Sequence, residues 1–520
     1  MNSSSNQSAT IAAPSRLRPY LLPSLADVLF IAIFVALCYG NPRLRLLSDA
    51  GIGWHIRTGQ WILQHHSVPH TDLFSNVPTR AWFAWEWLFD VVVAVIHGWS
   101  GLNGVLAFSA FLMALCFALL LRWTVQSGAP LWAAFAFVAL AVLSSTVHAL
   151  ARPHLVTWLF TLVCWYLLEQ KRNTGWLWLL PALVLIWVNV HGGFLVAFAL
   201  MGLCLVGEVL PMLLRTAEST AGSPRRNILR LAVVLLASFF ASLLNPYGFH
   251  LYQHIYEYLG DPFIRQHNLE MQSPDFHSVG ARCFALLLLL AGVVAVTRFR
   301  RLRMDQALVL IFFAASALFS VRNVPLAAIV MTLTVAPLLS GRAADTDRTS
   351  SRNGLGLAIR RFSRRMAALE GHARGTFWAL LCVLLTIGAC TNGGRILGRQ
   401  ILQAGFNPER FPIRAVDFLS QHPVQGPMFT VDAWGGYVIY REWPALQVVV
   451  DDRHDMYGSD YMRGYLSIIH GEKDWQERLL GTGARIVLIA KNGALANAMR
   501  GEPAWRLAYE DDQAVVFEKR

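Results

Sequence analysis

Long apolar runs separated by short polar loops dominate the first 400 residues of the chain. A helix needs about 20 mainly apolar residues to cross the hydrocarbon core of a bilayer. About 11 runs approach that length, near residues 24–40, 102–122, 130–147, 153–170, 175–190, 195–214, 228–245, 283–297, 305–320, 324–340 and 377–394. The pattern predicts a mainly α, polytopic helical membrane protein.

Composition supports this prediction, since 55% of the residues are hydrophobic and only 15% are charged. Basic residues such as Arg225, Arg300 and Arg360 fall in alternate loops, as the positive-inside bias requires if the N-terminus is cytoplasmic. An odd number of crossings then places the C-terminus outside. The net charge of +12 is therefore a topology signal, and basic residues spread over many short loops predict no nucleic-acid partner.

The polar segments divide the chain into predicted parts. A cytoplasmic tail (1–23) precedes a transmembrane domain (24–398), which includes a long first external loop (41–101) and a basic cytoplasmic linker (342–376). Residues 399–520 have the composition of a small extracytoplasmic α/β domain. Its predicted strands are Met428–Val431, Tyr437–Tyr440, Leu446–Val450, Arg485–Ala490 and Ala514–Glu518, and its predicted helices are Ile413–Gln421, Tyr461–Ile469 and Asp474–Leu480.

Aromatic residues at helical spacing mark the external loops. The segments from Trp54 to His65, from Trp82 to Ile96 and from His250 to Leu259 predict helices that lie in the membrane interface. Tryptophan favours headgroup depth. We therefore expect that depth for the tryptophans of the first loop, which are Trp54, Trp61, Trp82, Trp85 and Trp87.

Asp49 opens the first loop, and it is the first candidate for chemistry. A carboxylate beside an apolar surface can act as a general base. It can equally cap the helix that starts nearby. From the residues alone both roles stay open.

Two arginines lie at external helix ends, where the positive-inside bias disfavours them. The guanidinium groups of Arg152 and Arg322 are suited to bidentate binding of a lipid phosphate. Snorkelling to headgroups or pairing with a carboxylate is the competing interpretation. His154, Asn189 and His191 lie at the same expected depth, so all five side chains could converge on one site.

The order of several short motifs resembles the GT-C superfamily of integral-membrane glycosyltransferases, in particular bacterial members that use polyprenyl-phosphate sugars. The likeness runs over most of the chain. The motifs are Asp49-x-x-x-Gly-Trp-His-x-x-x-Gly59, Asp72-x-Phe-Ser75, Trp85-Glu-Trp87, Arg152-Pro153, His191-Gly-Gly193, Asn245-Pro-Tyr-Gly248, Ser273-Pro-Asp-Phe276, Arg322-Asn323 and Trp434-Gly-Gly-Tyr437.

The resemblance implies transfer of a sugar from a polyprenyl-phosphate donor to a glycan, lipid or protein acceptor outside a bacterial inner membrane, with inversion. Asp49 would be the base, and the residues expected to bind substrate or lipid phosphate are His55, Arg152, His154, His191 and Arg322. Supporting roles would fall to Trp54, Asp72, Glu86, Asn189 and Asp275. Relatives often carry a second acid two positions after the first, where this chain has Gly51. No metal-binding residue is therefore assigned, no cofactor is firmly implied, and a divalent metal stays open.

Two other functions remain alternatives. A lipid or glycan transporter or flippase would need ionisable groups near the middle of the bilayer, whereas the acids within the runs (Asp27, Glu169 and Glu208) lie towards their cytoplasmic ends. A non-catalytic membrane scaffold would agree with Gly51. Neither a phosphate-binding glycine loop nor a nucleophile elbow is present in the sequence, which argues against nucleotide hydrolysis.

Overall fold

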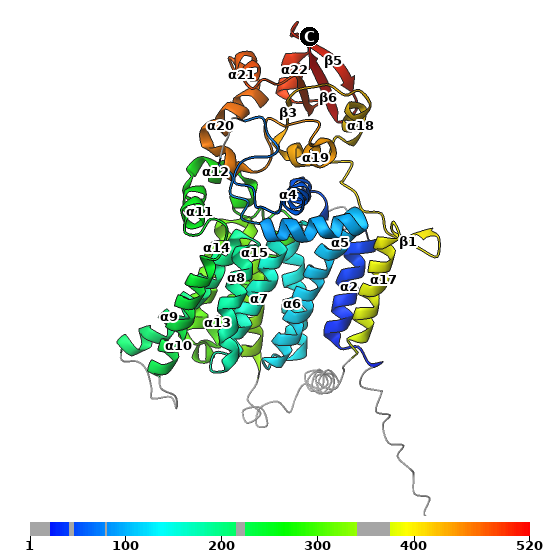
Figure 1. Cartoon of the computed structure of the whole chain (residues 1–520). Coiled ribbons are helices and arrows are strands. Elements are labelled where there is room, and N and C mark those ends of the chain that lie inside the picture. The colour runs from blue at the N-terminus through cyan, green and yellow to red at the C-terminus, as the bar shows by residue number, and fades with distance from the viewer. Residues whose placement is uncertain (1–20, 41–45, 78–80, 215–223, 341–374) are drawn as a thin grey trace, which may run out of the picture.

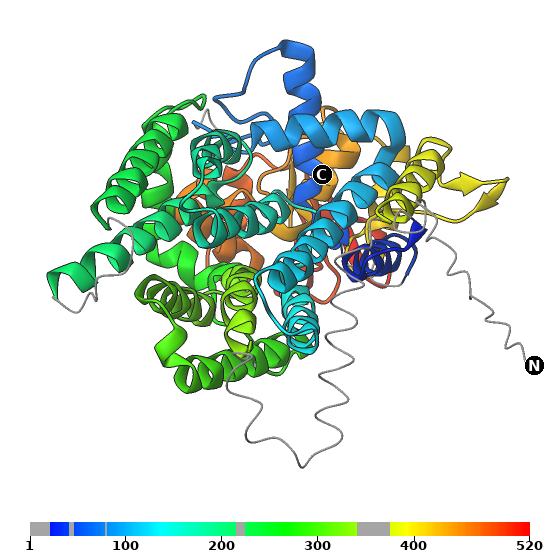
Figure 2. The same ribbon diagram turned by 90° about the horizontal axis from the view of Figure 1, so that it is seen from below.

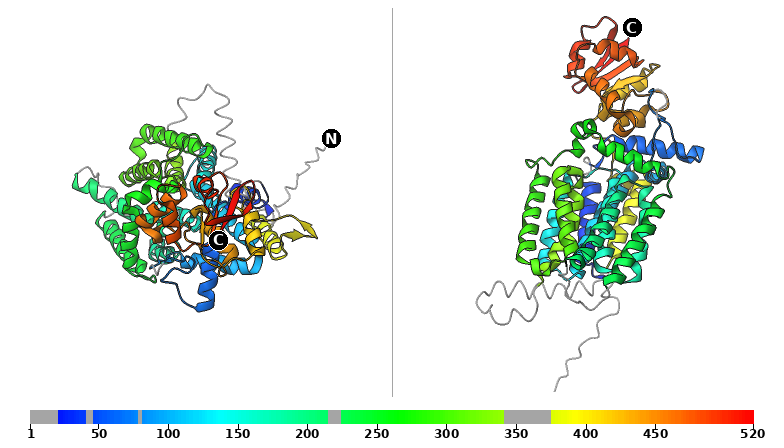
Figure 3. Two further views of the ribbon diagram at one scale, coloured as in Figure 1. Left: turned by 90° about the horizontal axis from the view of Figure 1, so that it is seen from above. Right: turned by 90° about the vertical axis from the view of Figure 1, so that its left-hand side faces the viewer.

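The computed structural model describes residues 21–40, 46–77, 81–214, 224–340 and 375–520. A bundle of helices forms one part of the molecule, and a smaller mixed α/β part is stacked on one end of it (Figures 1 and 3). We call this the site end of the bundle. The predicted tail (1–23) and linker (342–376) lie almost wholly outside the described residues.

Each apolar run of the sequence contains a helix. The bundle helices are α2 (Leu25–Tyr39), α5 (Trp87–Gln126), α6 (Leu131–Ser145), α7 (His154–Gln170), α8 (Leu179–Val188), α9 (Leu195–Leu213), α10 (Pro224–Ser242), α13 (Val279–Thr297), α14 (Met304–Phe319), α15 (Val324–Val335) and α17 (Phe377–Thr391). Within the described ranges, five helical segments are long and apolar enough to cross a membrane by themselves. Large apolar side chains such as Leu289 and Val293 point outward with 67% and 60% exposure, as lipid-facing residues do. The chain is a multi-pass membrane protein.

The long helix α5 changes direction at Gly101, whose φ of 58° is left-handed. Its first half lies across the site end, and its second half runs down into the bundle (Figure 1). Helices α2 and α17 lie side by side although they are far apart in sequence (Figures 1 and 2). The Tyr39 hydroxyl lies 2.8 Å from Oγ1 of Thr386 across that contact.

A middle layer of short helices covers the site end. It consists of α4 (Gly51–His65), α11 (His250–Gly260) and α12 (Pro262–His267). The helices predicted at Trp54–His65 and His250–Leu259 are confirmed. Trp54 and Trp82, however, are only 8% and 3% exposed. Both rings pack under the C-terminal part instead of facing outward, and their depth in the membrane stays a prediction.

The C-terminal part is built on a four-stranded sheet with the order β3-β4-β6-β5. Strand β3 (Met428–Thr430) runs parallel to β4 (Ile486–Ala490), and β6 (Ala514–Lys519) is antiparallel to both β4 and β5 (Trp505–Glu510). A two-stranded hairpin, β1 (Arg395–Ile396) with β2 (Arg399–Gln400), precedes this part. The helices of the part are α18 (Ile413–Gln421), α19 (Asp432–Glu442), α20 (His454–Ile469), α21 (Trp475–Gly481) and α22 (Ala494–Met499).

Two predicted strands differ from the structure. Tyr437–Tyr440 lies in helix α19, whose glycine face packs closely against α4. Leu446–Val450 is extended, but only Val448 pairs there, with Met428 of β3 and with Ser75 of the first loop. The first loop thus adds a bridge to the edge of the C-terminal sheet, a long-range pairing that local sequence preference does not encode.

Helices α4 and α19 cross at two glycines. A Cβ on Gly53 would lie 2.2 Å from the carbonyl oxygen of Gly436, and a Cβ on Gly436 would lie 2.5 Å from that of Ala50. Next to the crossing, Nε of Arg57 donates a hydrogen bond to the carbonyl oxygen of Tyr440 at 2.9 Å. The first loop and the C-terminal part are therefore joined by direct backbone contact, and this joint sets the roof of the cavity below.

Candidate active site

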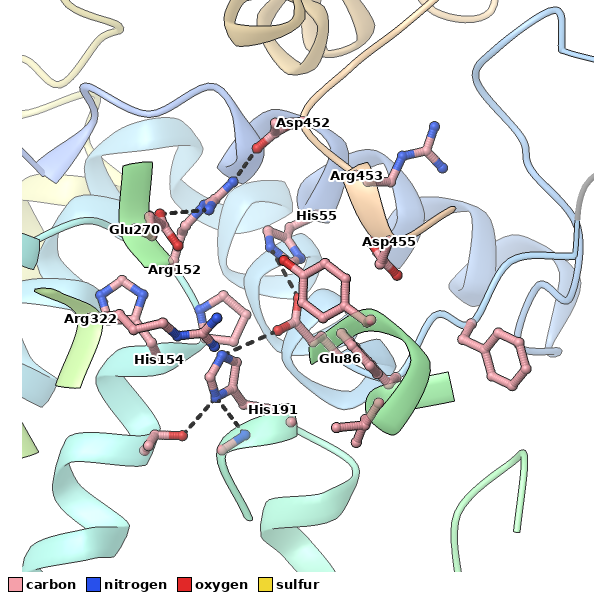
Figure 4. A pocket seen from close by; sticks show the side chains of 18 of the residues that line it. His55, Glu86, Arg152, His154, His191, Glu270, Arg322, Asp452, Arg453 and Asp455 are labelled. Atoms are coloured by element: carbon pink, nitrogen blue, oxygen red, sulfur yellow. Dashed lines mark hydrogen bonds and ion pairs between the residues drawn. The ribbon is translucent and has the colours of Figure 1, made fainter. Parts of the chain in front are cut away.

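A cavity of about 190 Å³ lies between the site end of the bundle and the C-terminal part. Its walls come from segments distant in sequence, including α4, the loop before α5, the start of α7, the turn before α9, helix α11 and the loop before α20. Figure 4 shows the charged and imidazole side chains that face it. They include His55, Glu86, Arg152, His154, His191, Glu270, Arg322, Asp452 and Asp455.

Arg152 lies at the centre of a group of three carboxylates. Its Nε is 2.7 Å from Oδ1 of Asp49, and its Nη1 is 3.3 Å from Oε1 of Glu270. Its Nη2 pairs with Oδ2 of Asp452. Burial acts to lower the pKa of Arg152, but Asp49 and Asp452 raise it above its ordinary value. With three anions around one cation, Arg152 is already neutralised by the protein.

Asp49 lies behind Arg152 and does not line the cavity. Its Oδ1 also accepts a hydrogen bond from the backbone N–H of Gly51 at 2.8 Å, at the first turn of α4. The N-cap residue of α4 is nevertheless Ala50, which has no side-chain cap, so Asp49 lies one position before the cap and meets the first turn only through Gly51. The base role of Asp49 stays a prediction. Its Oδ1 is already engaged by both Arg152 and Gly51.

Gly51 has a spatial reason to lack a side chain. A Cβ there would lie 2.3 Å from Nη2 of Arg152 and 2.8 Å from Oδ2 of Asp452. The space in which relatives are expected to carry a second acid is thus occupied by a carboxylate from the C-terminal part. Trp54 Nε1 donates to Oδ1 of Asp452 at 3.0 Å, which fixes that carboxylate. Burial raises the pKa of Asp452 to about 7, although Arg152 opposes the shift.

Glu86 lies between two imidazoles at the floor of the cavity (Figure 4). Nε2 of His55 is 3.6 Å from one oxygen of Glu86, and Nε2 of His191 is 3.6 Å from the other. Burial raises the pKa of Glu86 to about 8, with Arg152 and Arg322 opposing the shift. Burial also lowers the pKa of His55 well below its ordinary value and, together with Arg322, that of His191 to about 3. Both imidazoles are therefore neutral.

The orientation of His191 is fixed by donors on its other ring nitrogen. Nδ1 accepts from the backbone N–H of Gly193 at 3.0 Å and from the Thr157 hydroxyl at 2.8 Å. That hydroxyl in turn accepts from Nε1 of Trp187 at 2.9 Å. Because Nδ1 carries no hydrogen, the neutral ring carries its hydrogen on Nε2, which faces Glu86.

Replacing Thr157 by valine should release His191 while keeping the volume of the side chain. The buried Trp187 N–H would lose its acceptor, which costs about 1–3 kcal/mol, and Nδ1 of His191 would lose one of its donors. We expect a lower unfolding temperature for Thr157→Val, measured by thermal unfolding of the full chain. Thr391→Val is the matched control, since the exposed Thr391 hydroxyl donates only to carbonyl oxygens of its own helix α17. Equal unfolding temperatures for the two variants would contradict a stabilising role for the hydrogen bonds that join Trp187, Thr157 and His191.

Arg322 presents a guanidinium that has no counter-ion in the part of the chain that the structure describes. It extends from the turn before α15 into the cavity towards His191 and Glu86 (Figure 4). Among the described residues, no carboxylate lies within ion-pair distance of it, in contrast to Arg152. Of the two arginines predicted to bind phosphate, Arg322 is thus the one with free hydrogen-bond donors.

The structure brings only some of the other predicted residues to the cavity. Trp54 and His154 line it, and Nε2 of His154 is 2.9 Å from the carbonyl oxygen of His148. Asn189 instead joins helices, accepting from Nε1 of Trp87 at 2.8 Å. Asp72 pairs with Nη1 of Arg453 at 2.8 Å, outside the cavity lining. Asp275 is 72% exposed and pairs with His277, away from the site.

Sequence reasoning missed Glu270 and Asp90 and assigned no site role to Asp452. Burial acts to raise the pKa of Glu270, but His148, Arg152 and Arg322 together lower it to about 2. Asp90 lies one helical turn after Glu86, and its Oδ1 is 2.6 Å from Nδ1 of His55. The i, i+4 spacing of Glu86 and Asp90 was the available signal, because it places both acids on one face of a helix.

The chain is similar to known proteins in its structure. No family model and no curated protein matches the sequence. The archaeal oligosaccharyltransferase AglB from Archaeoglobus fulgidus, solved with an inhibitory peptide and a dolichol-phosphate, aligns with a TM-score of 0.56 at 11% identity over 89% of this chain and 69% of that chain. A second AglB structure, with Zn and sulfate, aligns with a TM-score of 0.50 at 11% identity over 89% of this chain and 68% of that chain. AglB is a GT-C membrane glycosyltransferase.

The chain has the fold of this oligosaccharyltransferase. ArnT from Cupriavidus metallidurans, bound to undecaprenyl phosphate, gives a weaker alignment with a TM-score of 0.48 at 15% identity over 94% of this chain and 97% of that chain. The cavity lies between the helical bundle and the C-terminal part, where the first loop meets both.

A divalent metal does not fit the cavity as the described side chains are arranged. The three carboxylates that could serve as ligands already surround the guanidinium of Arg152. Within the described ranges, no group of three or more His, Cys, Asp or Glu side chains is arranged to hold a metal ion. The cation at this point of the site is the arginine itself.

Proposed function

We propose that the protein is a membrane glycosyltransferase that moves a sugar from a polyprenyl-phosphate donor to an acceptor on the extracytoplasmic face of a bacterial inner membrane. The observation that carries the proposal is Arg322, a cation for which the described ranges supply no counter-ion, in a cavity at one end of a membrane bundle. A guanidinium binds phosphate oxygens through two parallel hydrogen bonds. In an enclosed site it stabilises the phosphate that leaves as the sugar is transferred.

The orientation of the bundle supports the extracytoplasmic placement. Arg225 and Arg226 begin α10, and Arg300 and Arg301 follow α13, so all four lie at the end opposite the cavity. Basic residues accumulate on the cytoplasmic side of membrane proteins. The cavity and the C-terminal part would then face outward, with a glycan, lipid or protein as the acceptor.

The reaction proposed is a single displacement with inversion. The acceptor oxygen forms a bond to the anomeric carbon, the bond from that carbon to the phosphate oxygen breaks, and the phosphate leaves with the electron pair next to Arg322. Asp49 and Asp452 would act by holding Arg152 in place, and Arg152 itself lines the cavity. A proton must leave the acceptor during this step, so the site needs one basic group.

Transfer can be tested with the purified full chain in lipid nanodiscs. A panel of radiolabelled undecaprenyl-phosphate-linked hexoses and pentoses would be supplied with lipid, glycan and peptide acceptors, and release of undecaprenyl phosphate would be measured. Sugar transfer, or slow hydrolysis with water as acceptor, supports the proposal. Movement of the lipid across liposomes without loss of its sugar would support a flippase instead, and binding without either outcome would support a scaffold.

Transfer should not depend on a divalent metal. Because Arg152 occupies the position between the three carboxylates, a dication would have to displace it against charge repulsion. We expect an unchanged rate after treatment with EDTA and after addition of Mg²⁺ or Mn²⁺. A rate that falls tenfold with EDTA and recovers with one metal would contradict this prediction.

A further inference from the structure

Glu86 differs from the other described carboxylates that line the cavity. Asp452 and Glu270 are paired with Arg152, Asp455 lies 3.1 Å from Nε2 of His254, and Asp90 lies 2.6 Å from Nδ1 of His55. Asp49 does not line the cavity. Within the described part of the chain, no arginine or lysine lies within ion-pair distance of Glu86. Its oxygens face only the two neutral imidazoles, so they are available to a proton.

The His55–Asp90 pair holds the ionised form of Glu86. Nδ1 of His55 lies 2.6 Å from Oδ1 of Asp90, so one hydrogen lies between them. When Asp90 holds that hydrogen, Nε2 of the neutral His55 carries the ring hydrogen and points it towards an ionised Glu86. Nε2 is 3.6 Å from the nearer Glu86 oxygen, slightly beyond a hydrogen bond.

On the opposite side, His191 offers a donor that does not change. Its Nε2 hydrogen points at the other oxygen of Glu86, because Nδ1 is engaged by Gly193 and Thr157. The carboxylate is therefore held in place while one of its oxygens gains or loses a proton. An ionised carboxylate that two imidazole N–H groups face keeps further lone pairs for a proton from the cavity, which is the arrangement of a general base.

We propose that Glu86 is the catalytic base of the sugar transfer, and that Asp49 is a positioning residue that holds Arg152. The inference rests on the proposed function. The hydrogen of the acceptor hydroxyl moves to the oxygen of Glu86 that faces His55, while the acceptor oxygen bonds to the anomeric carbon and the phosphate departs towards Arg322. After product release, Glu86 returns the proton to solvent and its oxygen again faces His55 Nε2.

The charged and titratable groups around Glu86 set the pH at which it works. His55 and Asp90 face it from the α4 and α5 side, and His191 faces it from the turn before α9. Arg152, Glu270, Arg322 and Asp455 act on it from the remaining walls. Burial dominates this balance and raises the pKa of Glu86 to about 8. Since the ionised form is the base, the rate should rise with pH through that value.

The test compares rate profiles from pH 6 to 10 for the wild type, Glu86→Gln and Asp49→Asn, using the undecaprenyl-phosphate-linked sugar that the wild type turns over and water or its acceptor. We expect Glu86→Gln to lower kcat at least a hundredfold, with undecaprenyl phosphate affinity changed less than about threefold and the unfolding temperature unchanged. Asp49→Asn should retain the rising limb near pH 8. Glu409→Gln, an exposed glutamate of the C-terminal part, is the matched control.

The outcomes separate this inference from the proposed function. Transfer that survives in Glu86→Gln, or a rising limb lost in Asp49→Asn and kept in Glu86→Gln, would overturn the assignment of the base and leave the function standing. Equal losses of kcat and of undecaprenyl phosphate binding in Glu86→Gln would assign the residue to binding and also overturn it. A wild type that releases sugar from no donor would overturn the proposed function, and the assignment with it. If Glu86→Gln fails to fold, Glu86→Asp, with a shorter side chain, should show a shifted rising limb, and an unshifted limb would count against Glu86.

Discussion

Replacing Arg322 by glutamine should weaken binding of undecaprenyl phosphate by about tenfold to a hundredfold. The side chain of Arg322 enters the cavity without a carboxylate partner among the described residues, so its hydrogen bonds are free for the ligand. Charge-assisted hydrogen bonds of this kind contribute about 1.5–3 kcal/mol each. Binding can be measured by native mass spectrometry and by the rise in unfolding temperature that undecaprenyl phosphate produces.

Arg282 provides the matched control for this experiment. It is an exposed arginine near the site end of α13, and its Nε contacts only the carbonyl oxygen of Ser278. Arg282→Gln should bind undecaprenyl phosphate as the wild type does. If Arg322→Gln also binds normally, the phosphate is held elsewhere and the proposed site is wrong. Arg152→Gln is a poorer probe, because it would leave Asp49, Glu270 and Asp452 without their counter-ion.

Replacing Arg453 by methionine should be among the most destabilising single changes in the C-terminal part. Arg453 is 2% exposed and pairs with Asp451 at 2.6 Å and with Asp72 of the first loop at 2.8 Å. Its guanidinium also lies 4.6 Å from the ring centre of Trp82. Removing one partner of a buried ion pair typically costs about 3–5 kcal/mol, because the remaining charge is uncompensated.

The unfolding temperature of the full chain, followed by tryptophan fluorescence, measures this effect. Arg506→Met is the control, because Arg506 pairs with Glu518 while remaining 67% exposed, and such pairs contribute about 0–1 kcal/mol. We expect a fall of several degrees for Arg453→Met and almost none for Arg506→Met. Similar unfolding temperatures for both variants would show that the buried pair does not hold the C-terminal part to the first loop.

The sequence predicted the bundle well because each of its helices leaves a local signal. A run such as 283–297 is apolar over its whole length, and the structure has α13 there. The helix predicted for His250–Leu259 was found for the same reason, since its aromatic residues recur at helical spacing. Prediction failed at Tyr437–Tyr440, where two glycines next to apolar residues indicated a turn and a strand. The glycines serve instead to bring two helices close together.

The site could be predicted only in part, because its contacts join distant segments. Arg152 and Asp452 are 300 residues apart in the chain, and no local pattern marks their pairing. The sequence showed that Gly51 stands where relatives often carry an acid. Only the structure shows that the carboxylate of Asp452 fills the space beside it. Arginines at unfavoured external positions were a usable signal for Arg152 and Arg322. The sequence could not show that Arg322 has the free hydrogen-bond donors, because the carboxylates that surround Arg152 come from distant segments.

The bridge between Ser75 and Val448 has a consequence for how this protein is made. Asp452 and Arg453 follow that bridge by a few residues, so the wall of the cavity that they form is set only when the segment around Val448 has docked on the first loop. A chain whose synthesis stops after α17 would carry Arg322 and Glu86 but lack the roof above them. The cavity is therefore completed late in biogenesis, and a partly synthesised chain leaves it open.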